Sequence, residues 1–135
     1  MVDARLPDGS RVSAVVPPLA VSGASLTIRR FSSDPIELAD LIHFNALTPE
    51  MGEVLRALVG ARVSVLVCGA PGSGRTVLLN VLSGFIPAGE RIVTVEETAE
   101  LRLPQRHVVR LEPRGASGGG GGARPEVTVR DLVRH

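Results

Sequence analysis

The sequence predicts a mixed α/β fold, in which a β-rich first third is followed by a module that alternates strand, helix and strand. Up to Phe31, short stretches of alternating apolar and polar residues are separated by turn signals, and after Asp34 the apolar residues recur with the period of a helix. Apolar residues make up 44% of the 135 residues and only three residues are aromatic. Aliphatic side chains, with valine the commonest, must therefore form the core, which suits buried parallel strands.

The first third is expected to contain three strands, over residues 2–6, 10–16 and 24–31. Pro7 and Gly9 lie between the first two strands and indicate a tight turn, because proline presets its own φ and glycine adopts a positive φ at little cost. The segment that follows these strands, residues 34–60, is expected to form two helices.

Asp34, Pro35 and Glu37 form a helix-start pattern of capping residue, proline and glutamate, which predicts a short helix from Pro35 onward. Thr48 is expected to cap a second helix in the same way, and Gly60 to end it.

The second half alternates between the two kinds of element. We expect strands over residues 62–68, 91–95 and 107–111, and a helix from about residue 75 to residue 83. Strand, helix and strand at this spacing indicate a parallel sheet. The segment 112–126 is predicted to be a flexible glycine-rich loop, because it cannot bury enough apolar surface to order itself.

The C-terminal residues read as the start of a further helix. Thr128 and Asp131 form a capping-box pattern, but no C-terminal signal follows before His135. The sequence is therefore expected to stop in the middle of an element.

Composition excludes several classes of function. All 15 basic residues are arginine and balance 14 carboxylates, so the formal charge of +1 predicts no nucleic-acid partner. The single cysteine, Cys68, excludes an internal disulfide framework and fits a reducing compartment. No apolar run reaches the roughly 18 residues that span a bilayer, and the first residues do not resemble a signal peptide. We therefore expect a cytoplasmic protein without a transmembrane segment.

The turn between the strand at 62–68 and the following helix carries the strongest chemical motif. Residues 69–76 match the phosphate-binding pattern G-x-x-x-x-G-K-[ST] at every defined position except the lysine, which is replaced by Arg75. Glycines let backbone N–H groups wrap around phosphate oxygens, the helix N-terminus favours an anion, and the hydroxyl of Thr76 suits Mg²⁺. A glycine-rich connection with no ligand is the alternative, at roughly one chance in ten, because both flanking elements agree with the motif.

Arg75 changes what this loop is expected to do. Lysine is a compact charge on a slim stem, whereas arginine is a wide planar fork that keeps the charge but does not fit the same space. Phosphoryl transfer depends on that placement. We therefore expect weakened nucleotide binding and much reduced hydrolysis.

Several segments in family order resemble the type II/IV secretion ATPases, and most of all the CpaF/TadA branch that powers assembly of Tad-type pili. They are residues 3–12, 17–19 and 25–31, the glycine loop, residues 95–101 and residues 127–133. The resemblance implies that residues 1–31 are the β-rich C-terminal part of an N-terminal domain. Residues 32–47 would be a linker with a short helix, and residues 48–135 the N-terminal part of a RecA-like P-loop ATPase domain.

The resemblance also implies a site and partners. The intact family forms a hexameric cytoplasmic motor that uses ATP and Mg²⁺ and works with secretion or pilus platform proteins at the inner face of the inner membrane. Glu96 and Glu97 match its acidic box, written Glu-Asp in the family, which helps to position Mg²⁺ and the attacking water. Arg29 and Arg30 match a basic strand end that faces nucleotide. The remaining nucleotide-binding positions are Gly69, Ala70, Pro71, Gly72, Ser73, Gly74, Arg75, Thr76 and Val77.

The departures from the family pattern leave a second interpretation open. The Walker B strand and the His box of the family have no counterpart in this sequence, and the chain stops before the place where they would follow. Glu96 and Glu97 could also be an ordinary solvated acidic turn, and Arg29 and Arg30 a surface pair. The alternative is therefore a truncated or degenerate paralogue that does not catalyse hydrolysis, and that binds nucleotide weakly or only docks on an intact motor.

Overall fold

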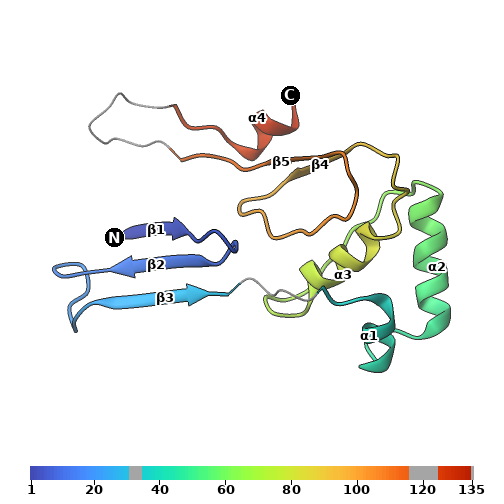
Figure 1. The fold of residues 1–135 in the computed structure, drawn as a ribbon, viewed down its shortest axis with the longest axis horizontal. Helices are drawn as coiled ribbons and strands as arrows, with labels where there is room; N and C mark the ends of the chain where they lie inside the picture. The colour runs from blue at the N-terminus through green and yellow to red at the C-terminus, as the bar shows by residue number, and fades with distance from the viewer. Residues whose placement is uncertain (31–34, 116–124, 135) are drawn as a thin grey trace. The chain divides into compact units, whose positions relative to one another are not determined.

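A computed structural model describes residues 1–30, 35–115 and 125–134 (Figure 1). The chain divides into two compact units, Met1–Pro35 and Ile36–His135. The first unit is all β in its described part, and the second contains helices and parallel strands. The chain is therefore a mixed α/β protein, as the sequence predicts.

The first unit is a three-stranded antiparallel sheet in the order β1-β2-β3. Its strands are β1 (Val2–Arg5), β2 (Arg11–Val15) and β3 (Ser25–Arg29), so all three predicted strands are confirmed with slightly shorter bounds. Val12 lies opposite Ala4 in β1 and opposite Ile28 in β3.

The turn between β1 and β2 forms as its residues predict. Gly9 has a φ of +89°, and the Leu6 N–H donates to the Ser10 carbonyl oxygen at 2.8 Å. The Asp8 carboxylate accepts hydrogen bonds from the backbone N–H and the hydroxyl of Ser10, both at 2.9 Å. These bonds favour the ionised form and hold the pKa of Asp8 below its usual value.

The second unit begins with two helices, α1 (Leu38–His43) and α2 (Pro49–Gly60). The prediction for α2 is confirmed, because the Thr48 hydroxyl accepts the Met51 N–H at 3.3 Å. The prediction that the first helix begins at Pro35 is wrong, and Asp34 lies outside the described residues. The Asp40 carboxylate accepts the Glu37 N–H at 2.8 Å, so this local pair caps the helix three residues later than expected.

The alternating part of the second unit contains α3 (Arg75–Ser83), β4 (Ile92–Val95) and β5 (Val108–Leu111). The strands pair in parallel, with Ile92 beside Val108 and Val95 beside Leu111, which confirms the predicted strand direction. The short helix α4 (Val129–Val133) follows, and Thr128 and Asp131 form the predicted capping box.

The strand predicted over residues 62–68 is not formed. These residues belong to no strand, and the structure describes no element that forms a hydrogen-bonded ladder with them. A strand needs a neighbouring strand to take its N–H and C=O groups, so an apolar run alone does not make one. The relative exposure of Leu66 is accordingly 87%.

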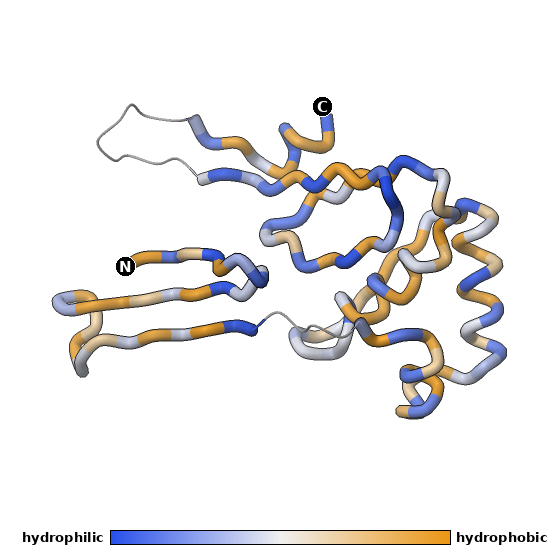
Figure 2. Tube along the Cα trace, in the orientation of Figure 1, coloured by the Kyte–Doolittle hydropathy of each residue, from blue (hydrophilic) through white to orange (hydrophobic). Residues whose placement is uncertain are grey.

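The core of the second unit is small, and α3 lies at its centre. Leu41, Val81 and Leu82 are its buried apolar side chains within the described residues, and the apolar positions of α3 are visible in Figure 2. Gly52 lets α2 approach α1, because an added Cβ would lie 3.0 Å from the Leu38 side chain. The Arg56 guanidinium also lies 4.8 Å from the ring centre of Phe85, which ties α2 to the end of α3.

The predicted loop 112–126 is described only at its ends. Arg114 and Val127 form an isolated antiparallel bridge, with N–H to carbonyl distances of 2.9 and 2.8 Å. Residues 116–124, which include the glycine run, lie outside the described residues. Within the described part of the chain, no helix has the length and apolar character needed to cross a membrane.

Candidate functional site

The glycine loop, residues 69–76, leads directly into α3, as the sequence predicts. Gly72 and Gly74 have φ values of +79° and +86°, a backbone region that other residues rarely adopt. Gly74 is the N-cap of α3, and its carbonyl oxygen accepts the Leu78 N–H at 2.9 Å. The two glycines therefore set the path of the chain into the helix.

Gly69 lies close to the side chain of Ser73. A Cβ added at this residue would meet the Ser73 hydroxyl and would lie 3.3 Å from the Ser73 Cβ, so the serine side chain would have to shift. The loop is closed at this point, because the Ser73 N–H donates to the Ala70 carbonyl oxygen at 3.1 Å. The loop thus folds back on itself, and glycine at residue 69 leaves room for Ser73.

The start of α3 is open to a ligand. Its N-cap is a glycine, so no side chain caps the first N–H groups of the helix. Arg75 and Thr76 are exposed, and no hydrogen bond or ion pair engages either side chain within the described part of the chain. The unpaired N–H groups, the helix dipole and the arginine charge together favour an anion at this end of the helix.

The predicted loop residues share this exposure. All of them are exposed except Val77, which is half-buried as the first apolar residue of α3. They are Gly69, Ala70, Pro71, Gly72, Ser73, Gly74, Arg75 and Thr76.

The acidic turn, residues 96–101, begins where β4 ends. The Glu96 N–H donates to the Leu111 carbonyl oxygen at 3.0 Å, which continues the β4–β5 ladder by one bond. Glu96 Oε2 accepts the N–H groups of Glu100 and Leu101, at 2.9 and 3.0 Å. Glu96 Oε1 is buried and has no hydrogen-bond partner within residues 35–115 and the other described ranges.

The two glutamates of this turn therefore differ. Glu96 is half-buried and holds the backbone of the turn with one carboxylate oxygen, whereas Glu97 is exposed. The interpretation of a wholly solvated acidic turn does not fit Glu96. Its second oxygen has no donor among the described residues, as is also the case for Thr94 Oγ1 and Gln105 Oε1.

Two amide side chains, not singled out in the sequence, connect this turn region to α3. Asn80 Oδ1 accepts the Arg102 N–H at 2.7 Å. Gln105 Nε2 donates to the carbonyl oxygens of Ser83 and Ile86, at 2.8 and 3.0 Å. The available signal was a lone asparagine inside an apolar helix, four residues after Thr76.

The predicted arginines belong to the other unit. Arg29 is the last residue of β3 and Arg30 follows it, and both are exposed. The glycine loop and the acidic turn both belong to the second unit, whereas Arg29 and Arg30 belong to the first.

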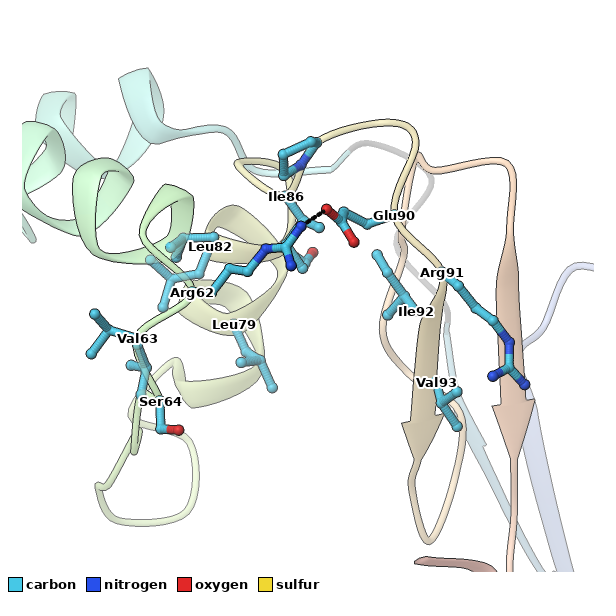
Figure 3. A pocket seen from close by; sticks show the side chains of 14 residues that line it. Arg62, Val63, Ser64, Leu79, Leu82, Ile86, Glu90, Arg91, Ile92 and Val93 are labelled. Carbon is cyan, nitrogen blue, oxygen red and sulfur yellow. Dashed lines mark hydrogen bonds and ion pairs between the residues drawn. The ribbon is translucent and has the colours of Figure 1, made fainter. Parts of the chain in front are cut away.

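The second unit has a groove whose lining includes no residue of the glycine loop. It has a volume of about 500 Å³ and runs between the extended residues after α2, the side of α3 and β4 (Figure 3). The ion pair between Arg62 and Glu90 spans it. Its walls are mainly apolar and include Val63, Val65, Leu79, Leu82, Ile92 and Val93. None of the predicted site residues lines this groove.

The side chains of the glycine loop and the acidic turn limit the kind of metal site that they could form. Among the described residues, no three His, Cys, Asp or Glu side chains gather as a metal-binding group. The loop offers two hydroxyls, on Ser73 and Thr76, and the acidic turn offers carboxylates. Such a set fits Mg²⁺ that arrives with phosphate oxygens and keeps several waters, rather than an ion held by protein ligands alone.

Comparison with known proteins places the whole chain in one family. A family model described as "Type II/IV secretion system protein" matches residues 1–135. The chain is 42% identical to an uncharacterized protein of Methanocaldococcus jannaschii, over 100% of this chain and 19% of that protein. It is 38% identical to the type IV secretion system protein PtlH of Bordetella pertussis, over 76% of this chain and 37% of that protein. The chain thus spans between about a fifth and about two fifths of these curated relatives.

Among solved structures, the chain is similar to the VirB11 ATPase from the Brucella suis type IV secretion system, crystallised in complex with sulphate. The sequence identity is 31%, the match covers 82% of this chain and 42% of that chain, and the TM-score is 0.43. The family assignment rests on the sequence match over residues 1–135.

Proposed function

Because this chain belongs to the type II/IV secretion system protein family, we propose that it is the ATP-binding segment of a secretion or pilus-assembly motor. The observation that carries the proposal is the glycine loop, which opens α3 at Gly74 with no side-chain cap and with Arg75 and Thr76 exposed. A loop of this kind is suited to phosphate, because its N–H groups and the helix dipole face one anion.

Each residue of the loop has a role in this proposal. Backbone N–H groups between Gly69 and Val77 donate to phosphate oxygens, except at Pro71, which has none, and at Ser73, whose N–H is bonded to Ala70. Arg75 supplies positive charge. The Thr76 hydroxyl would hold the Mg²⁺ that accompanies ATP, and such an ion would supply positive charge beside the phosphate oxygens. The side chains of Glu96 and Glu97 orient water around that ion.

The wider assignments are part of the same proposal. We place the chain in the CpaF/TadA branch, with residues 48–135 as the N-terminal part of a RecA-like domain and residues 1–31 as part of the preceding domain. The protein would act as a hexameric ring at the cytoplasmic face of the inner membrane, together with secretion or pilus platform proteins. Arg29 and Arg30 would contact nucleotide from the preceding domain.

Arg75 favours a second candidate, a family member that does not hydrolyse ATP. Arginine keeps the charge of the usual lysine but presents a wide, planar group to the phosphates. Such a protein binds nucleotide weakly or only interacts with an intact motor. ATP turnover by the chain would exclude the second candidate.

The proposal is tested by titrating the chain with a fluorescent ATP analogue and Mg²⁺. Gly74→Ala forces a side chain into the left-handed region at the helix start, and we expect affinity to fall at least about tenfold. Gly23→Ala is a matched control, because Gly23 also has a positive φ, of +114°, and open space around it, but lies in the first unit. Equal affinity of both variants would contradict the proposal.

The same samples decide between the two candidates. ATP turnover is measured for the chain and for Arg75→Lys. A rise in turnover with lysine supports a motor weakened at this residue and excludes the non-catalytic candidate.

A further inference from the structure

We propose that Asn80 is a positioning residue, which fixes the acidic turn to α3, the helix that follows the glycine loop. In this position the Glu96 carboxylate and the Thr76 hydroxyl would serve the same Mg²⁺. The inference rests on the proposed nucleotide function, and it assigns a role to a residue outside the glycine loop and the acidic turn. Asn80 touches neither the phosphates nor the ion in this proposal. It acts by holding the backbone at Arg102.

The first step of the argument is the face of α3 on which Asn80 lies. Thr76, Asn80 and Ser83 are spaced four and three residues apart, so they share one side of the helix. Exposure falls along this side, from exposed Thr76 through half-buried Asn80 to buried Ser83. The side of α3 that presents the predicted Mg²⁺ hydroxyl is therefore the side that packs inward one turn later.

The second step is the contact made by the Asn80 side chain. Its Oδ1 accepts the Arg102 N–H at 2.7 Å across 22 residues of sequence. Arg102 is half-buried and lies between β4 and β5, outside either strand, so its N–H is not part of the sheet ladder. A buried N–H without a partner is costly, and Asn80 supplies the acceptor that the sheet does not.

The third step connects Arg102 to Glu96. The neighbouring N–H groups, those of Glu100 and Leu101, both donate to Glu96 Oε2. The consecutive N–H groups of Glu100, Leu101 and Arg102 thus donate to two side chains. These are the Glu96 carboxylate, at the end of β4, and the Asn80 amide, in α3. The conformation of the Glu96 carboxylate, including its unpartnered oxygen Oε1, is fixed relative to α3 through this chain of bonds.

A second tie holds the far end of the same segment. Gln105 is 8% exposed, and its amide donates to the carbonyl oxygens of Ser83 and Ile86 at the end of α3. The segment from Glu96 to Gln105 is therefore attached to α3 at both Asn80 and Ser83. Loss of the Asn80 side chain removes the contact nearest Glu96 and leaves the hydrogen bonds of Gln105 in place.

The test uses Asn80→Leu, which keeps the branched shape of the side chain but is larger and has no acceptor, and Asn80→Asp, which retains an acceptor oxygen. Binding of a fluorescent ATP analogue is measured with Mg²⁺ and with EDTA. We expect the leucine variant to lose about 10- to 100-fold of the Mg²⁺ enhancement, the usual effect of residues that orient metal ligands. Its affinity in EDTA should be unchanged, because the glycine loop is untouched. Asn80→Asp should behave as the wild type.

Hydrogen exchange gives a second readout that does not depend on nucleotide. The Arg102 amide should exchange about two- to tenfold faster in Asn80→Leu than in Asn80→Asp, the size expected from one lost hydrogen bond. Ser83→Ala is the control, since it removes the 2.6 Å bond from Ser83 Oγ to the Asn80 carbonyl without touching Arg102. If the leucine variant does not fold, Asn80→Ala takes its place, because alanine is a strong helix former.

The outcomes separate this inference from the proposed function. Wild-type protein that binds no nucleotide overturns the proposed function and, with it, the role of Asn80. Wild-type binding that depends on Mg²⁺, combined with the same dependence in Asn80→Leu, overturns the role of Asn80 alone.

Discussion

The two apolar stretches that flank α3 have similar composition and different structures. Residues 63–68 precede the glycine loop, belong to no strand and are mostly exposed, with Leu66 at 87%. Residues 92–95 form β4, which pairs in parallel with β5, and Thr94 is 7% exposed. The helix α4 also contacts β4.

The difference shows that partners, rather than apolar content, decide which stretch becomes a strand. The N–H groups of Ile92 and Glu96 donate to the carbonyl oxygens of His107 and Leu111, both at 3.0 Å. Residues 63–68 have no such ladder within the described part of the chain. The first prediction below compares these two stretches directly, and two smaller ones concern the contacts of α3 and the cap of α4.

The largest effect is expected from proline in β4. Ile92→Pro removes a ladder donor and a half-buried side chain, and should lower the free energy of unfolding by about 2–4 kcal/mol. Val65→Pro, in the stretch without a ladder, should change it by less than about 0.5 kcal/mol. Urea unfolding measures both. Equal losses would mean that residues 63–68 are held as firmly as β4.

A smaller effect is expected from the contacts on the two sides of α3. Gln105→Leu removes the amide that donates to the Ser83 and Ile86 carbonyl oxygens, of which the Ser83 oxygen keeps the Ile86 N–H, and should cost about 1–2 kcal/mol of unfolding free energy. On the groove side, Arg62→Ala breaks an exposed ion pair with Glu90, and should cost about 0–1 kcal/mol. Unfolding at two salt concentrations is informative, since only the ion pair weakens with salt.

The smallest effect concerns α4, which contacts β4. Hydrogen bonds from the Thr128 hydroxyl, at 2.6 Å, and from its N–H, at 2.9 Å, hold the pKa of Asp131 below its usual value. The carboxylate therefore supports the helix fully above the ordinary pKa of aspartate, and this support is lost as pH falls through the lowered pKa.

An NMR titration of the Asp131 carboxyl, followed with the amide shifts of α4, checks this sequence of events. Thr128→Ala should move the titration midpoint upward, toward the ordinary value. Amide shifts in β5 should not follow it. A midpoint unchanged by Thr128→Ala would contradict the assigned cause.

The candidate site could be read from the sequence where local geometry defines it. Gly72 and Gly74 adopt the positive φ values that the loop motif needs, and α3 begins and ends where the apolar spacing indicates. The turn at Gly9 and the capping box at Thr128 were predictable for the same reason, since each depends on residues within a few positions of one another.

The contacts made by Asn80 and Gln105 could not be read in this way. Each joins residues that are 19 to 22 positions apart, and nothing in the sequence near Asn80 indicates Arg102 as its partner. The different burial and hydrogen bonding of Glu96 and Glu97 could not be read from the sequence either, because adjacent identical residues differ only through what the fold places beside them.

The sequence by itself determined the order and type of nearly every element, the family and the phosphate-loop pattern with arginine in the lysine position. These properties follow from spacing and local bonding, which are present in any short stretch of chain. Only the tertiary structure decided that residues 63–68 form no ladder and that α3 holds the acidic turn through Asn80. Both depend on the partner that a backbone group meets, and that partner is set by the fold.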